Sequence, residues 1–213
     1  MMRLWLPGCS SGEEAYSIAM LLHEQSERAR VPLDVQIFAT DIDEAAIRIA
    51  RDGVYSSTAT AHITPARLRH YFTHDRRTSS YRVATQLRDM VVFAIHNVVR
   101  DPPFSRLDLI SCRNLLIYLN SGVQRRMLQL LHFALNPGGY LLLGASETPG
   151  QHQTLFQNID LGARIYQRLA RASGSSSGET LMARASQRAV GSAATAHDER
   201  PPSLRQLTEQ VLL

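Results

Sequence analysis

Two carboxylates follow a turn of small residues near the start of the chain. The turn is Gly8-Cys9-Ser10-Ser11-Gly12, and Glu13 and Glu14 come directly after it. Glycine allows sharp bends and lets a ligand approach the backbone closely. The turn's amides and the start of a helix favour negative charge. The two carboxylates would nevertheless repel a pyrophosphate, whereas they would attract a ligand that carries an ammonium group.

These properties favour S-adenosylmethionine (SAM), which has an amino-acid end and a ribose but no phosphate. The turn from Gly8 to Gly12 is therefore interpreted as a SAM site. An ordinary strand-to-helix turn with solvated glutamates fits the same residues. A dinucleotide site would need the pattern G-x-G-x-x-G, and here Ser10 replaces the second glycine.

A further acid ends the next apolar run of the chain. Asp41 follows the predicted strand Asp34–Thr40. In nucleotide-binding α/β folds, an acid at this point accepts hydrogen bonds from ribose hydroxyls, and SAM carries the same ribose. Asp41 could instead cap the helix predicted from Glu44, and Asp41 and Asp43 can divide these two roles between them.

Alternating strands and helices are predicted to position these residues. Strands are predicted at Arg3–Leu6, Asp34–Thr40, Met90–Ile95, Leu107–Ser111, Tyr140–Gly144 and around Ala163–Arg168. Helices are predicted at Glu13 to Arg28, Glu44 to Arg51, Pro65–Phe72 and, capped by Ser121, Val123 to Leu135, with a turn at Asn136–Gly139. This order predicts an α/β fold with a mainly parallel sheet and helices on both faces. Ligands of such sheets bind beyond the carboxyl ends of the strands, and the turn, Asp41, Asn97 and Cys112-Arg113-Asn114 all fall there.

Two segments depart from this alternation. Residues 54–92 predict a small β-rich subdomain inserted over the main sheet. Residues 170–202 are rich in Ser, Ala and Gly and predict a flexible linker, so we expect 171–200 to be mobile and removable without unfolding the domain at 1–169. Residues 203–213 have the apolar spacing of a further helix.

The composition argues against several classes of protein. All 23 basic residues are arginine and lie scattered along the chain, so a solvated surface is favoured over a nucleic-acid face. No apolar run approaches the ~20 residues that span a bilayer, and no signal peptide opens the chain. We therefore expect a cytoplasmic protein without membrane insertion. Cys9 and Cys112 are predicted to be free thiols, and no metal site is predicted because the histidines are scattered.

Several motifs together resemble the chemotaxis-receptor methyltransferases (CheR type). These motifs are Gly8–Glu14 with Tyr16–Ala19, Phe38–Asp43, Cys112–Asn114 with Ile117-Tyr118, Asn136–Tyr140 and Gly144–Glu147. The resemblance covers about residues 3–169. It implies a Rossmann-like class I SAM-dependent methyltransferase that methylates glutamate side chains of methyl-accepting chemoreceptors and releases S-adenosylhomocysteine. In some members of that family, the small β-subdomain grips a receptor tail peptide.

The resemblance also implies how the chain holds SAM. Its implied ligand contacts are Glu14 for the amino-acid end, Asp41 for the ribose, Asn97 and Val98 around the adenine, and Cys112, Arg113 and Asn114 closing the pocket. Tyr118 is implied to lie near the transferred methyl group, where it could orient the incoming carboxylate. Arg113 could attract that carboxylate. The structural alternatives are an aromatic that caps the core at Tyr118 and a surface ion pair at Arg113.

The family also has a helical domain before its first strand, and we expect this chain to be without it because its first predicted strand begins at Arg3. We therefore expect the chain as given to bind SAM weakly and to methylate receptors slowly or not at all. Residues 203–213 resemble the segment that leads into a PAS sensor domain in fused methylesterase–methyltransferase–kinase proteins. A non-catalytic SAM-binding or receptor-docking module and an NAD-dependent oxidoreductase remain alternative functions.

Overall fold

The computed structural model describes residues 1–150 and 154–170 of the chain. The linker predicted at 170–202, except for its first residue, and the helix predicted at 203–213 lie outside the described residues. In the described part, none of the helices combines the length and the apolar character needed to cross a membrane.

A seven-stranded sheet forms the centre of the fold, in the order β6-β2-β1-β7-β8-β10-β9. The strands are β1 (Met2–Pro7), β2 (Val35–Asp41), β6 (Val91–Ile95), β7 (Leu107–Cys112), β8 (Leu135–Leu143), β9 (Phe156–Asp160) and β10 (Ile165–Arg168). Neighbours from β6 to β8 pair in parallel, whereas β10 is antiparallel to both β8 and β9. The predicted mainly parallel α/β sheet is confirmed.

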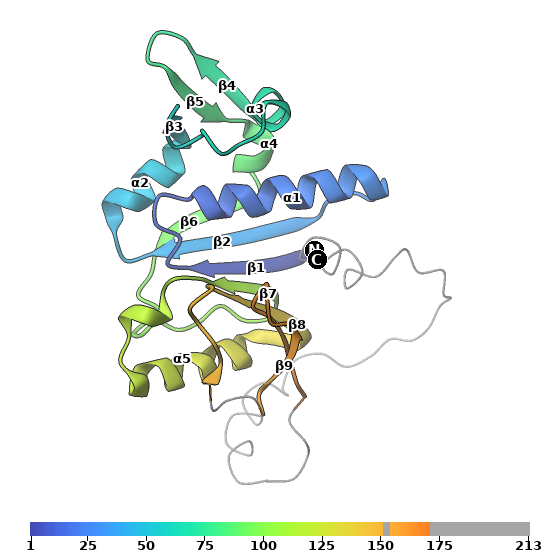
Figure 1. Cartoon of the computed structure of the whole chain (residues 1–213), viewed down its shortest axis with the longest axis vertical. Coiled ribbons are helices and arrows are strands. Elements are labelled where there is room, and N and C mark those ends of the chain that lie inside the picture. The colour runs from blue at the N-terminus through green and yellow to red at the C-terminus, as the bar shows by residue number, and fades with distance from the viewer. Residues whose placement is uncertain (151–153, 171–213) are drawn as a thin grey trace, which may run out of the picture.

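Helices cover both faces of this sheet (Figure 1). Helices α1 (Glu13–Ala29) and α2 (Glu44–Asp52) pack on one face, and α5 (Ser121–Ala134) packs on the other. Successive side chains of β1 serve the two faces in turn: Leu4 and Leu6 join the core under α1, and Trp5 joins the core under α5. A strand that is buried on both faces needs apolar residues throughout, which explains the continuous apolar run.

The inserted subdomain lies beyond α1, at the top of Figure 1. Its three-stranded antiparallel sheet has the order β3-β5-β4 and is built from β3 (Val54–Ser56), β4 (Phe72–Asp75) and β5 (Ser80–Val83), together with helices α3 (Pro65–Tyr71) and α4 (Thr85–Arg88). Arg67 on α3 donates two hydrogen bonds, of 2.7 and 2.6 Å, to the Glu24 carboxylate on α1. This bidentate ion pair ties the subdomain to the main domain. Because β6 begins at Val91, the last two residues of the predicted insertion belong to the main sheet.

Three local predictions were wrong near the carboxyl half of the sheet. Strand β9 was not predicted as a separate strand. The predicted turn Asn136–Gly139 lies within β8, where the pairing with β7 shifts register. Helix α5 is capped by Asn120 rather than by Ser121, because the Asn120 side chain accepts a hydrogen bond of 3.0 Å from the Val123 amide.

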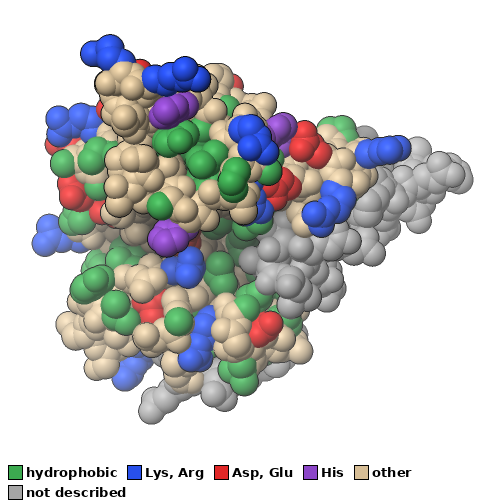
Figure 2. Space-filling view, turned by 45° about the horizontal axis from the view of Figure 1, so that its top comes forward, with side chains coloured by type: hydrophobic (Ala, Val, Ile, Leu, Met, Phe, Trp, Pro, Cys, Tyr) green, Lys and Arg blue, Asp and Glu red, His purple; other side chains and the backbone are tan. Residues whose placement is uncertain are grey.

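The arginine side chains are spread over the face drawn in Figure 2 and do not form one continuous stripe there. A continuous basic stripe is the usual footprint of nucleic-acid binding. The solvated surface without a nucleic-acid face stays a prediction from the sequence.

Candidate functional site

The glycine turn connects β1 to α1 at the carboxyl edge of the sheet. Gly8 and Gly12 have φ values of +75° and +90°, which side-chain-bearing residues rarely adopt. A β-carbon on Gly12 would also lie 2.8 Å from the β-carbon of Ala50 on α2 and 3.0 Å from the ring of Phe93 on β6. Gly12 therefore allows the start of α1 to pack closely against both of these elements.

Asp41 supports this turn from the end of β2. One carboxylate oxygen accepts a hydrogen bond of 2.8 Å from the Ser10 amide, and the other accepts one of 3.0 Å from the Asp43 amide. Asp43 itself caps α2 by accepting hydrogen bonds from Ala45 and Ala46. Each Asp41 oxygen has a second lone pair that can accept from a ligand. Since Asp41 already holds the Ser10 amide, that amide is not available to a pyrophosphate.

Glu14 connects the turn to the end of β7. Its carboxylate accepts a hydrogen bond of 2.5 Å from the Ser111 hydroxyl, and Arg113 Nη1 lies 3.7 Å from its other oxygen. The surface ion pair that the sequence offered as the alternative for Arg113 is thus present as a loose contact with Glu14, which is itself a predicted site residue. Ser111 is buried beside Glu14 and was not predicted as a site residue. The feature of the sequence that could have identified Ser111 is its position, as a small hydroxyl residue directly before Cys112-Arg113-Asn114.

The Cys9 thiol shows that this part of the edge carries a negative potential. Burial raises its pKa to about 12, and the charges of Asp41, Glu14 and Glu13 contribute in the same direction. Burial, the largest cause, disfavours any charge at the thiol, whereas the three carboxylates disfavour a thiolate and favour a cation there. The acidic turn therefore suits a ligand with positive charge better than one with phosphates.

We expect Cys9 to resist alkylation in the folded chain. At pH 8, a pKa of about 12 leaves roughly 1000-fold less thiolate than an ordinary thiol has. Iodoacetamide labelling followed by mass spectrometry should therefore modify Cys9 slowly in buffer and readily in urea, and labelling in buffer should rise as the pH approaches 12. Equal labelling rates in buffer and in urea at pH 8 would contradict this view of the site.

Asn97 and Val98 follow β6 on the same edge as Asp41. Asp41 pairs with Ile95, and the His96 amide donates a hydrogen bond to the Asp41 carbonyl. The Asn97 side-chain oxygen accepts hydrogen bonds from two amides of its own turn, so its side-chain amide nitrogen is the group left to face a ligand. Val98 is partly buried and packs against the core cluster under α5.

The predicted site residues after β7, Cys112-Arg113-Asn114, have different surroundings in the structure. The Cys112 side chain is completely buried in the core under α5, so its thiol packs there, and the pocket contact implied for Cys112 stays a prediction. Asn114 has a left-handed φ of +56° and turns the chain away from the strand. Tyr118 ends the short helix η1 (Leu116–Tyr118) and is 81% exposed, so it does not cap the core.

Glu147 holds this segment in place although it is only 4% exposed. Its two carboxylate oxygens accept hydrogen bonds from the amides of Asn114, Leu116, Ile117 and Gly144, at 2.9, 2.7, 3.3 and 2.8 Å. Gly144 must lack a side chain, because a β-carbon there would lie 2.7 Å from the Glu147 carboxylate. The segment that ends in Tyr118 is therefore fixed by one buried carboxylate that the predicted site did not include.

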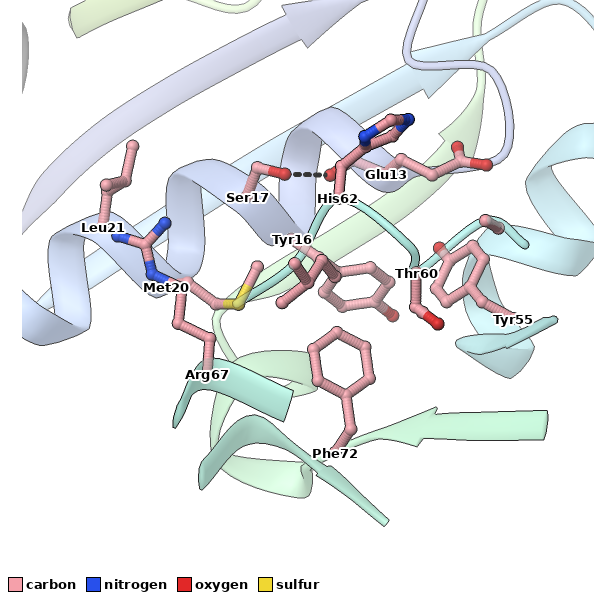
Figure 3. Close-up of a pocket in the computed structure, with 12 residues that line it drawn as sticks. Glu13, Tyr16, Ser17, Met20, Leu21, Tyr55, Thr60, His62, Arg67 and Phe72 are labelled. Carbon is pink, nitrogen blue, oxygen red and sulfur yellow. Dashed lines mark hydrogen bonds between the residues drawn. The ribbon is translucent and has the colours of Figure 1, made fainter. Parts of the chain in front are cut away.

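A separate pocket of about 260 Å³ lies between α1 and the inserted subdomain. The side chains of Tyr16 and Met20 on α1 face Phe72 of the subdomain across it, and Arg67 lies at one end (Figure 3). None of the predicted SAM contacts lines this pocket. Glu13, which follows the turn, does line it, so the cavity begins beside the acidic turn but does not contain the predicted SAM contacts.

Comparisons with known proteins identify the family. The family model described as "CheR methyltransferase, SAM binding domain" matches residues 1–165. An uncharacterized 104.1 kDa protein from the hypE 3' region of Rhodobacter capsulatus is 41% identical over 168 residues, which are 79% of this chain and 17% of that protein. The chemotaxis protein methyltransferase of Borreliella burgdorferi is 37% identical over 148 residues, which are 68% of this chain and 52% of that protein.

A third relative agrees with these two. Chemotaxis protein methyltransferase 1 of Pseudomonas aeruginosa is 33% identical over 171 residues, which are 78% of this chain and 62% of that protein. The chain thus spans less than two thirds of the length of these three relatives. With most of its own length matched by the family model, the chain belongs to the CheR methyltransferase family, in its SAM-binding domain.

Proposed function

We propose that this chain binds SAM at the carboxyl edge of its parallel strands and transfers the methyl group to glutamate side chains of chemoreceptors. The observation that carries the proposal is the pair of contacts at this edge, in a chain of this family: Asp41 accepts a hydrogen bond from Ser10 of the turn, and Glu14, directly after the turn, accepts one from Ser111 at the end of β7. The names of the two chemotaxis protein methyltransferases among its relatives support receptors as the substrates.

The residues at the edge fit SAM chemically. Glu14 offers a carboxylate to the ammonium group, and Asp41 offers acceptors to the ribose hydroxyls. Asn97 and Val98 offer a polar group and an apolar surface to the adenine. The negative potential at Cys9 suits the positive charge of a sulfonium. When bound, SAM supplies a methyl group on that sulfonium sulfur, which is the electrophile of the reaction.

The chain's own residues then have to guide a carboxylate to that methyl group. A glutamate side chain is ionised at neutral pH, since its ordinary pKa is about 4.3, so it attacks without a general base. Arg113 lies 3.7 Å from the Glu14 carboxylate, too far for a hydrogen bond, and we infer that its exposed guanidinium attracts the incoming carboxylate. Tyr118 is exposed beyond the segment that Glu147 holds, where its hydroxyl can orient the same group. Alignment and exclusion of water are the main sources of rate in such a transfer.

Methyl transfer to a receptor tests the proposal. We expect labelled methyl groups from SAM to appear, at the low rate that the sequence predicts for this chain, as base-labile esters on a purified chemoreceptor, and not on a receptor whose methylated glutamates are replaced by glutamine. Tyr118→Ala should lower the rate about 10- to 100-fold through misalignment, with SAM affinity retained. Phe133→Ala is the matched control, because Phe133 on α5 is also a highly exposed aromatic, at 73% against 81% for Tyr118.

The outcomes separate the candidate functions. SAM binding without any methyl transfer would favour a non-catalytic SAM-binding or docking module. Equal rates for Tyr118→Ala and the unchanged chain would remove Tyr118 from the proposed mechanism.

A further inference from the structure

Two histidines and a glutamate converge on the surface where α3 meets α1. His23 and Glu27 lie one turn apart on α1, and His70 lies on α3. Glu27 has one oxygen 3.7 Å from His23 Nδ1 and the other 4.0 Å from His70 Nε2. One ligand atom from each residue falls within 4.8 Å of the other two. We propose that His23, Glu27 and His70 form a zinc site that joins the inserted subdomain to α1.

The donor set suits Zn²⁺. Two imidazoles and one carboxylate are a known set of protein ligands for this ion, with water in the fourth position, and their bonds to it are ~2.0–2.2 Å long. An ion at the centre would draw the three ligand atoms together by about 1 Å, which rotation of partly exposed side chains allows. The i, i+4 spacing places His23 and Glu27 on the same face of α1, so the helix presents two ligands without distortion.

The existing contacts of these side chains do not replace an ion. Distances of 3.7 and 4.0 Å are too long for hydrogen bonds between Glu27 and either ring. His23 Nδ1 lies 3.2 Å from the Tyr71 hydroxyl, and a metal at that nitrogen would exchange one neutral hydrogen bond for a coordinate bond. The neighbouring Arg67 is already neutralised by its bidentate pair with Glu24. The guanidinium therefore presents little net positive charge to a cation.

A bound ion would fix the position of α3 against α1. The ion pair between Arg67 and Glu24 lies at the same junction, and the pocket of about 260 Å³ is bounded by the same two elements. Zinc would thus be a second link between α3 and α1, beside the Arg67–Glu24 ion pair, and would fix the width of this pocket. The sequence did not predict the site, because His70 is brought to α1 only by the fold of the inserted segment. Zinc binding at these three residues does not depend on whether the chain transfers methyl groups.

Titration of the untagged 213-residue chain with ZnCl₂ tests the proposal. By calorimetry we expect saturable binding of about one ion per chain, and zinc should raise the thermal midpoint, because a ligand that binds only the folded state stabilises it. His70→Ala and Glu27→Ala should each weaken binding at least about 10-fold, since even residues that only support a ligand can cost ~10–100-fold. His62→Ala is the matched control, because His62 is an exposed histidine of the same subdomain.

Both test residues are more than half exposed at the side chain, at 52% for His70 and 56% for Glu27, so their substitution leaves the core intact. Circular dichroism and the zinc-free thermal midpoint will verify that each variant is folded. The proposal is overturned if the unchanged chain shows no saturable zinc binding. It is equally overturned if both variants bind zinc as tightly as His62→Ala does, because the ion would then be held elsewhere.

Discussion

Replacement of Glu147 by alanine is expected to lower the free energy of unfolding by about 4 kcal/mol or more. The Glu147 carboxylate accepts hydrogen bonds from four backbone amides; those of Leu116 and Gly144 are buried and would lose their partner, whereas those of Asn114 and Ile117 are only partly buried. Each buried group left unsatisfied costs roughly 1–3 kcal/mol. Because a typical domain is stable by only about 5–15 kcal/mol, this single change should bring the chain close to unfolding.

Urea denaturation measures this effect. Glu44→Ala is the control, since Glu44 is exposed in the first turn of α2 and should change stability by no more than about 0.5 kcal/mol. Glu147→Gln should be intermediate, because it keeps one acceptor oxygen but turns an NH₂ group toward amide donors. If Glu147→Ala were no more destabilising than Glu44→Ala, the buried carboxylate would not be what holds the segment before Tyr118.

Asp41→Ala is expected to weaken SAM binding about tenfold or more, whereas Asp43→Ala should leave it within about threefold. Each hydrogen bond to a charged group contributes roughly 1.5–3 kcal/mol, and 1.4 kcal/mol corresponds to a factor of ten in affinity. The structure gives the two aspartates different roles. Asp41 faces the turn and keeps acceptor capacity for a ribose, while Asp43 is the cap of α2.

The two substitutions should therefore affect different properties: Asp41→Ala mainly SAM affinity, and Asp43→Ala mainly stability. Asp43→Ala should cost about 1 kcal/mol of stability through the lost cap with little effect on binding. Calorimetric titrations with SAM and thermal denaturation of both folded variants supply the two readouts. Equal losses of SAM affinity in the two variants would place the ribose contact away from Asp41.

The turn and the helix cap at the carboxyl edge of the sheet could be predicted from the sequence because they depend on local residues. A positive φ at Gly8 and Gly12, an acid at the end of a strand and a helix cap at Asp43 each depend on a few neighbouring residues. The same reasoning could not decide which side chain after β7 faces the site. In a strand buried on both faces the apolar residues run continuously, so the sequence does not reveal which residues point to which face. The structure shows that Ser111 faces Glu14 and that Cys112 faces the core.

The remaining differences arise from contacts between distant segments. Glu147 meets the amides of Leu116 and Ile117 only after the chain returns through α5 and β8. Gly139 allows β8 to approach β7, since a β-carbon there would lie 3.1 Å from the carbonyl oxygen of Leu107. The residues that predict a turn in the sequence thus form an irregular stretch of β8, where the pairing with β7 shifts register. His70 reaches α1 in the same non-local way.

The central claim is that the acidic turn binds SAM rather than a dinucleotide. Calorimetric titration of the chain with SAM, S-adenosylhomocysteine and NAD tests it most directly, because the three ligands share an adenosine and differ in what meets Glu14 and the Ser10 amide. We expect SAM and S-adenosylhomocysteine to bind and NAD to give no detectable heat. Tight NAD binding without detectable SAM binding would contradict the account.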